Sequence, residues 1–195
     1  PPQPAAASRD FDLNASGEES KKKALLVGVN YVGTANALNG CINDANNLHR
    51  MLVRNYGFDE SNIKKLTEDN DQSEWPTRAN IENGIQWLLD GAQKGDLLFF
   101  SFSGHGCQVQ SHGDSEADGL DEVLCPLDAL IGGNFYDAII KDDWLTEQFH
   151  DKLPEGVKCI CNFDCCHSGT MADLAVQRDI EDSVVLSVQM RGVKL

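Results

Sequence analysis

The sequence predicts an α/β fold with a mainly parallel central sheet and helices on both faces. Two observations lead to this prediction. Short strand patterns alternate with amphipathic helix patterns, in the order strand, helix, strand, helix, strand, loop, helix, strand. The main strand patterns are also apolar runs, as expected for strands that helices cover on both faces.

Five segments have strand patterns: 23–31, 63–69, 96–106, 157–166 and 183–188. The third is the most apolar, and it breaks at Ser-Gly-His-Gly. A long loop with a small hairpin is expected to follow, through residues 122–129. In the fourth segment Val157, Cys159, Cys161 and Phe163 recur at period two, which places them on one face.

Three segments have helix patterns. In residues 41–57, one face carries Ile42, Ala45, Leu48 and Leu52, and Gly57 is a natural stop. In residues 76–95, Thr77 is a plausible N-cap and Gly95 the expected end, with the apolar stripe formed by Ile81, Ile85, Leu88 and Leu89. In the third, Asp142 or Asp143 is the expected cap, and the apolar residues are Trp144, Leu145, Phe149 and Leu153.

Length and composition favour one folded domain. The chain has 195 residues, of which we assign 1–22 to a disordered leader rich in Pro, Ala and Ser and 23–195 to the domain. The formal net charge of −15 argues against nucleic-acid partners and is compatible with cationic ligands. No apolar run reaches the roughly 20 residues of a membrane helix. Seven cysteines and no signal peptide favour reduced thiols in the cytoplasm.

The strand ends carry the candidate chemistry. His105 follows the third strand pattern, while Cys165 and Cys166 follow the fourth. In parallel sheets, ligands bind beyond the carboxyl ends of the strands, so neighbouring strands would bring His105 and a cysteine together. A histidine can ionise a thiol and later protonate a leaving amine. The N–H of Gly106 and that of the cysteine are candidate oxyanion donors.

Other interpretations of these residues remain open at this point. His167 is a poor base because adjacent side chains point apart, and His105 taken alone would be an ordinary turn histidine. A zinc site is disfavoured because Cys159 and Cys161 share a strand face and no second Cys-x-x-Cys pair exists. These two and Cys165 are better interpreted as small buried residues.

The sequence resembles the metacaspases, cysteine peptidases of the caspase-like clan. The resemblance rests on SFSGHG and FDCCHSG, in this order with an acidic loop between them, and on GCINDA after the first strand. It covers residues from about Lys23 to about Leu174, and the animal-caspase motif Gln-Ala-Cys is absent. It implies a caspase-like three-layer α/β/α sandwich and cleavage after Arg or Lys.

The resemblance also implies roles for individual residues. His105 corresponds to the catalytic histidine and Cys166 to the nucleophile, while Cys165 is dispensable. Asp44 and Asp164 correspond to acids that bind the substrate's P1 cation, and Cys41 and Ser103 lie beside them. A carboxylate pair suits a guanidinium or ammonium group. Asp44 on its own would equally be a first-turn acid favoured by the helix dipole.

Calcium is the cofactor that the resemblance implies, with Asp121, Asp142, Asp143 and Asp173 as ligands. The segment from Cys107 to Asp143 is rich in acids, and Ca²⁺ prefers such oxygen ligands. The alternatives are a solvated acidic loop, and Asp118 as the ligand in place of Asp121.

The family's sheet has two further strands from a smaller C-terminal segment, and only about twenty residues follow Asp173 here. We therefore expect either a large-subunit fragment whose partner segment was lost or cleaved, or a shorter relative that closes its sheet otherwise. The exposed sheet edge that results is suited to recruiting a partner chain. The functional prediction is a Ca²⁺-stimulated cysteine endopeptidase with Arg/Lys specificity. Its alternatives are a catalytically silent scaffold and a legumain-like peptidase. Candidate self-processing sites are Lys141, Arg178, Arg191 and Lys194.

Overall fold

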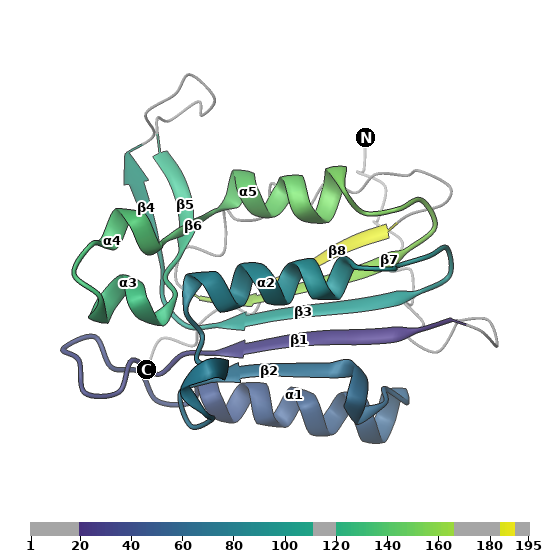
Figure 1. Cartoon of the computed structure of the whole chain (residues 1–195), viewed down its shortest axis with the longest axis horizontal. Coiled ribbons are helices and arrows are strands. Elements are labelled where there is room, and N and C mark those ends of the chain that lie inside the picture. The colour runs from purple at the N-terminus through teal and green to yellow at the C-terminus, as the bar shows by residue number, and fades with distance from the viewer. Residues whose placement is uncertain (1–19, 111–119, 166–183, 190–195) are drawn as a thin grey trace, which may run out of the picture.

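A five-stranded sheet forms the centre of the protein (Figure 1). The structure is a computed structural model that describes residues 20–110, 120–165 and 184–189. Every pairing in the sheet is parallel. The strand order across the sheet is β2 (Ile63–Thr67), β1 (Lys22–Gly28), β3 (Leu97–Ser103), β7 (Lys158–Asp164) and β8 (Val184–Gln189). All five predicted strands are therefore present, and the first begins at Lys22, one residue earlier than expected.

Helices cover both faces of this sheet, as the sequence predicts (Figure 1). Helix α1 (Cys41–Tyr56) lies on one face. The other face carries α2 (Arg78–Leu89) and α5 (Asp142–Thr146), which continues as a π-helical turn, Glu147–Asp151. Short 3₁₀ turns flank β2 at Glu60–Asn62 and Gln72–Glu74.

The alternation of side chains along the strands divides the core into two layers. The layer under α2 and α5 contains Leu25, Val27, Leu98, Phe100, Phe102, Cys159, Cys161 and Phe163. The layer under α1 contains Ala24, Leu26, Leu97, Phe99 and Ile160, packed on Ala45 and Leu52. Each fully buried Leu or Phe contributes about 1.5–3 kcal/mol to folding. The predicted common face of Val157, Cys159, Cys161 and Phe163 is confirmed, since all four lie in the layer under α2 and α5, whereas Ile160 lies in the layer under α1.

A small antiparallel sheet leaves the central one directly after β3. It consists of β4 (Gly106–Gln110), β5 (Leu120–Leu124) and β6 (Ile140–Lys141), in that order. The helices α3 (Leu127–Ile131) and α4 (Phe135–Ala138) connect β5 to β6 (Figure 1). The hairpin expected after the third strand is therefore present.

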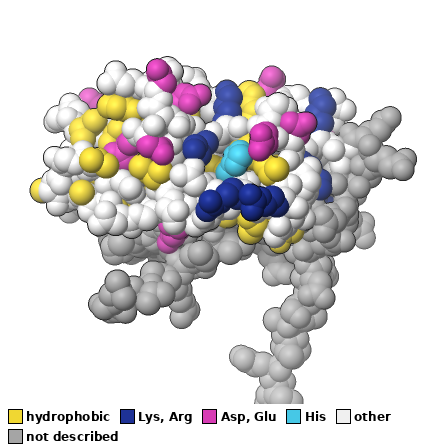
Figure 2. All heavy atoms as spheres, turned by 90° about the horizontal axis from the view of Figure 1, so that it is seen from below, with side chains coloured by type: hydrophobic (Ala, Val, Ile, Leu, Met, Phe, Trp, Pro, Cys, Tyr) yellow, Lys and Arg dark blue, Asp and Glu magenta, His cyan; other side chains and the backbone are white. Residues whose placement is uncertain are grey.

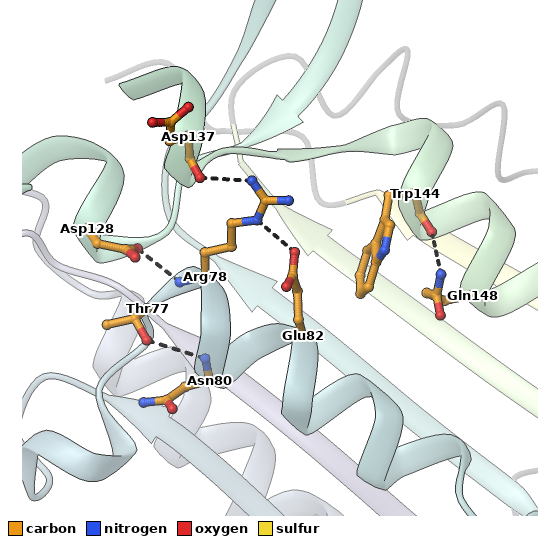
Figure 3. Close-up of polar contacts among 8 residues, drawn as sticks. All are labelled: Thr77, Arg78, Asn80, Glu82, Asp128, Asp137, Trp144 and Gln148. Atoms are coloured by element: carbon orange, nitrogen blue, oxygen red, sulfur yellow. Dashed lines mark hydrogen bonds and ion pairs between the residues drawn. The ribbon is translucent and has the colours of Figure 1, made fainter. Parts of the chain in front are cut away.

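The start of α2 fastens this small sheet to the rest of the protein (Figure 3). The backbone N–H of Arg78 donates to the Asp128 carboxylate at 2.9 Å, which ties α2 to α3. The Arg78 guanidinium donates to the backbone carbonyl of Asp137 at 2.8 Å and to Glu82 at 2.7 Å. These contacts fix the segment between β5 and β6 against α2.

Two predicted helix ends need correction. Thr77 caps α2 as expected, with its side chain accepting from the Asn80 N–H, but the helix ends at Leu89 and not at Gly95. The reason is a turn at Gly91, whose φ of 67° lies in the left-handed region that stops a helix. In α5, Asp142 is the first helical residue, and the extended Lys141 precedes it without a side-chain cap.

Helix α1 ends at Gly57 as predicted, with φ of 68°. Of its expected apolar stripe, Ala45 and Leu52 are buried while Ile42 and Leu48 are half-buried. Figure 2 shows the molecule from below, where basic, acidic and hydrophobic side chains are interspersed and some basic ones gather beside a histidine. No helix in the described part of the chain is long and apolar enough to cross a membrane.

Candidate active site

The carboxyl ends of three neighbouring strands lie level with one another. Gly28, Ser103 and Asp164 end β1, β3 and β7, and the register pairs Gly28 with Ser103 and Ser103 with Asp164. Because β3 and β7 are neighbours, His105 and Cys165 follow them at one edge, as the sequence reasoning required. Cys166, His167 and Asp173 lie outside the described residues.

The side chain of His105 is held on two sides. Its Nε2 lies 2.8 Å from the backbone oxygen of Asn36, and its ring packs on that of Tyr31 with centroids 4.8 Å apart. Since a carbonyl only accepts, Nε2 carries the hydrogen of the neutral ring, and Nδ1 carries the lone pair. This tautomer makes Nδ1 the nitrogen that can accept a proton.

Tyr31 fixes the backbone around His105. Its hydroxyl accepts from the His105 N–H at 2.8 Å and donates to the Cys125 carbonyl at 2.6 Å. Tyr31 is 0% exposed, and its φ of 52° places a bulky residue in the left-handed region. A side chain at Gly104 would put its Cβ 2.8 Å from the Tyr31 oxygen, which explains one glycine of Ser-Gly-His-Gly.

Glu68, just beyond β2, holds the loop that carries Tyr31 and Asn36. Its carboxylate accepts from the backbone N–H groups of Asn30, Tyr31 (3.0 Å) and Val32 (2.9 Å). Such charge-assisted bonds are stronger than neutral ones, so they offset the cost of the left-handed residue. Tyr31, Asn36 and Glu68 could not be predicted from the sequence, because no local motif marks them and their partners lie far away along the chain.

The backbone of Gly106 faces away from its neighbouring strand. In the β4–β5 ladder, Cys125 N–H donates to the His105 carbonyl at 3.0 Å, and Gly106 lies opposite Leu124 in the next pair. Antiparallel ladders alternate bonded and non-bonded pairs, so the Gly106 N–H points away from β5. It is therefore able to donate to a group at the sheet edge.

Four of the predicted substrate-binding residues come together on the α1 side of this edge. Cys41 and Asp44 lie in the first turn of α1, while Ser103 and Asp164 end β3 and β7. We call this group the acidic rim. The Ser103 hydroxyl lies 3.5 Å from the Asp44 carboxylate, and both Cys41 and Ser103 are buried. Gly28 permits this packing, because a Cβ there would lie 2.5 Å from the Cys41 carbonyl oxygen.

Negative charge accumulates on the acidic rim. Burial, followed by the charge of Asp44, raises the pKa of Asp164 above its ordinary value. The pKa of the Cys41 thiol is also raised, first by burial and then by Asp44 and Asp164 against a hydrogen bond from Ser103. No Lys or Arg in the described part of the chain pairs with Asp44 or Asp164. The rim is thus electrostatically suited to a cation.

The predicted metal ligands lie on the small sheet and α5. Asp142 is half-buried, and burial together with the charges of Asp143 and Glu122 raises its pKa to about 6. Asp121 is buried and forms an ion pair with Lys141 at 2.5 Å. No three His, Cys, Asp or Glu side chains of residues 20–110 and 120–165 are grouped as a metal site would require. The described residues by themselves thus do not form a metal site, although Asp142 and Asp143 are carboxylates of the kind that a hard cation prefers, and Asp121 is paired with Lys141.

Comparison with known proteins identifies the family. The model of the family described as "Metacaspase, peptidase C14 domain" matches residues 22–175. The chain is 45% identical over 155 residues to Metacaspase-1 of Cryptococcus neoformans (strain JEC21), covering 79% of this chain and 33% of that protein. It is 46% identical over 171 residues to Metacaspase-1 of Candida albicans, covering 85% and 37%. The chain thus spans about a third of the length of these relatives.

A solved structure shares the fold. Protein GSU0716 from Geobacter sulfurreducens aligns with a TM-score of 0.59 and 31% identity, covering 80% of this chain and 54% of that one. The shared fold, the two strand-end motifs and the family match agree. The chain belongs to the metacaspase family and contains its peptidase C14 domain.

Proposed function

We propose that the protein is a cysteine endopeptidase that cleaves after Arg or Lys and that Ca²⁺ stimulates it. One observation carries the catalytic part of this proposal. His105 follows β3 with Nδ1 as its basic nitrogen, and Cys165, the residue before Cys166 in the sequence, follows the adjacent β7 at the same edge. Family membership supports the same chemistry.

The proposed mechanism uses Cys166 as nucleophile and His105 as base. Nδ1 of His105 takes the thiol proton while the sulfur attacks the scissile carbonyl carbon. The N–H groups of Gly106 and Cys166 stabilise the negative oxygen that develops. His105 then protonates the leaving amine, and water attacks the thioester to regenerate the thiol.

Substrate preference follows from the acidic rim. A P1 guanidinium or ammonium group would neutralise Asp44 and Asp164. Burial, and then repulsion from Asp44, already raises the pKa of Asp164. Arg gains more than Lys because its planar fork can bind carboxylates bidentately. An acidic P1 residue would add a third negative charge there, so cleavage after Asp is disfavoured.

Calcium would act away from the reacting atoms. Asp142 and Asp143 would bind it, joined by Asp121 and Asp173. The bound ion would offset the burial and the repulsion from Asp143 and Glu122 that raise the pKa of Asp142, and it would tie α5 to the small sheet. Because β4 of that sheet begins at Gly106, directly after His105, ordering of the sheet would support the proposed site.

Peptide hydrolysis tests the proposal. The chain is assayed with fluorogenic peptides ending in Arg, Lys or Asp, with and without Ca²⁺. We expect turnover of the Arg and Lys peptides only, abolished in Cys166→Ala and retained in the matched neighbour variant Cys165→Ala. Turnover that survives Cys166→Ala would contradict the mechanism, and preference for Asp would contradict the specificity.

Labelling separates this proposal from a catalytically silent scaffold. A Lys- or Arg-directed electrophile should modify Cys166 when Ca²⁺ is present. Absence of any Cys166 adduct would favour the scaffold.

The metal is tested by Ca²⁺ titration. Asp142→Asn should require more Ca²⁺ for half-maximal activity than the exposed control Asp69→Asn.

A further inference from the structure

Two cysteines lie in contact beside His105, and neither belongs to the proposed catalytic machinery. Cys107 is the second residue of β4, and Cys125 directly follows β5. The ladder pairs Cys107 with Val123, two residues before Cys125, so both cysteines point to the same face of the hairpin. Their sulfur atoms are 3.8 Å apart, and both are thiols in the structure.

The two thiols differ in exposure and in acidity. Cys107 is half-buried, whereas Cys125 is 2% exposed. A hydrogen bond from the Cys125 thiol lowers the pKa of Cys107 to about 7, and the same bond, with burial, raises the pKa of Cys125. Cys107 therefore carries the thiolate that a solvent-borne oxidant can meet, and Cys125 retains its proton behind it.

We propose that Cys107 and Cys125 form a reversible disulfide under hydroperoxide and that this bond lowers peptidase activity. With hydrogen peroxide, the Cys107 thiolate attacks one oxygen and the O–O bond breaks with hydroxide as the leaving group, which gives Cys107 sulfenic acid. The hydroxide takes a proton from solvent and leaves as water. The Cys125 sulfur then attacks the sulfenic sulfur, and its proton leaves with the oxygen as a second water. A dithiol reductant restores both thiols.

The distance permits this step with small movements. A disulfide needs its sulfurs about 2.0 Å apart, so those of Cys107 and Cys125 must approach by less than about 2 Å. Rotation of the half-buried Cys107 side chain supplies part of this approach. The remainder is taken up by the hairpin backbone, because buried Cys125 has little room to rotate.

Movement of Cys125 is transmitted to His105 by hydrogen bonds already described. The Cys125 N–H donates to the His105 carbonyl at 3.0 Å, and the Cys125 carbonyl accepts from the Tyr31 hydroxyl at 2.6 Å. That hydroxyl in turn accepts a hydrogen bond from the His105 N–H. A displacement of about 1 Å at a catalytic group can lower the rate roughly a hundredfold. This effect on activity rests on the proposed function, whereas formation of the bond does not.

A second cysteine pair provides a matched comparison. The sulfurs of Cys159 and Cys161 are 3.9 Å apart, but both residues are 0% exposed in β7. Peroxide cannot reach them while the protein is folded, and residues two apart on one extended strand cannot close a disulfide without leaving the ladder. Proximity of sulfurs alone therefore predicts two oxidisable pairs, while exposure predicts only Cys107–Cys125.

Mass spectrometry tests bond formation independently of catalysis. The full chain with Cys166→Ala is treated with hydrogen peroxide, its remaining thiols are alkylated, and it is digested without reductant. We expect a linked Cys107–Cys125 peptide, lighter by two hydrogens and lost after dithiothreitol, while Cys159 and Cys161 become alkylated only on unfolding. Cys107 that stays a thiol, or that is oxidised without a link to Cys125, overturns the proposal.

Activity provides the second measurement. The parent chain and Cys107→Ser are oxidised side by side, and kcat is normalised to the intact Cys166 thiol measured in the same digests. We expect normalised kcat of the linked parent to fall about tenfold or more and to return with dithiothreitol, while Cys107→Ser keeps its value. Equal kcat in linked and reduced parent overturns the regulatory effect. A parent with no activity at all contradicts the proposed function and leaves the mass measurement to decide the disulfide.

Discussion

Replacing Tyr31 by Phe removes one hydroxyl and keeps the ring that packs on His105. The hydroxyl bridges two backbone groups, the His105 N–H at 2.8 Å and the Cys125 carbonyl at 2.6 Å. Phe fits the same buried space and the same backbone conformation. The substitution therefore isolates the bridge from the packing.

The expected loss in the free energy of unfolding follows from the two backbone groups that lose their hydrogen-bond partner. A buried donor or acceptor without a partner costs about 1–3 kcal/mol, and Tyr31→Phe strands one of each. The Tyr31 site is 0% exposed, so water does not readily replace the hydroxyl. We expect the free energy of unfolding to fall by about 2–6 kcal/mol, which corresponds to roughly 4–24 °C in Tm for a domain of this size.

Urea unfolding measures this loss, and peptide hydrolysis measures its effect on His105. The matched control is Tyr136→Phe, since Tyr136 is 67% exposed and its substitution should stay within about 0.5 kcal/mol. We also expect kcat to fall with KM nearly unchanged, because the bridge positions the base and does not touch the acidic rim. Stability within about 0.5 kcal/mol of the parent together with unchanged kcat would refute the reasoning.

Three further substitutions test separate contacts. Glu68→Gln replaces charge-assisted bonds to three backbone N–H groups by weaker ones. Urea unfolding should therefore show a loss of about 1.5–3 kcal/mol in the free energy of unfolding. The control Glu74→Gln, at an exposed residue, should lose almost none. Gly28→Ala places a Cβ 2.5 Å from the Cys41 carbonyl oxygen, and the same measurement should show a loss of about 1–3 kcal/mol. Asp142→Asn should stabilise the protein in Ca²⁺-free buffer. Because the pKa of Asp142 is raised from 3.8 to about 6, its ionisation destabilises the fold fully above pH 6, and this penalty disappears as the pH falls to 3.8. This rise in the pKa of Asp142 is equivalent to a destabilisation of the fold by about 3 kcal/mol. Solvent screening at a half-exposed carboxyl reduces that to about 1 kcal/mol. Thermal unfolding across this pH range checks the sign, and a stabilisation that persists at pH 3.8 would contradict the assignment.

Local patterns determine much of this protein. Apolar runs and amphipathic stripes locate all five strands of the central sheet and the main helices, because burial on one or two faces leaves a periodic trace in the sequence. Ser-Gly-His-Gly and Asp-Cys-Cys-His-Ser-Gly mark the ends of β3 and β7, since each motif begins where an apolar strand ends. The end of α2 was predicted wrongly at Gly95, because the turn at Gly91 stops the helix first.

Only the tertiary structure decides which strand ends meet. The order β2-β1-β3-β7-β8 puts β7 beside β3, and no periodicity specifies that neighbour. The bridge through Tyr31, the Glu68 carboxylate that holds its loop, and the contact between Cys107 and Cys125 likewise join residues from different strands and loops. Hydrogen bonds and packing across such separations depend on the folded positions of both partners. The sequence by itself therefore determines the chemical groups and their strands, and the packed sheet determines which of those groups touch.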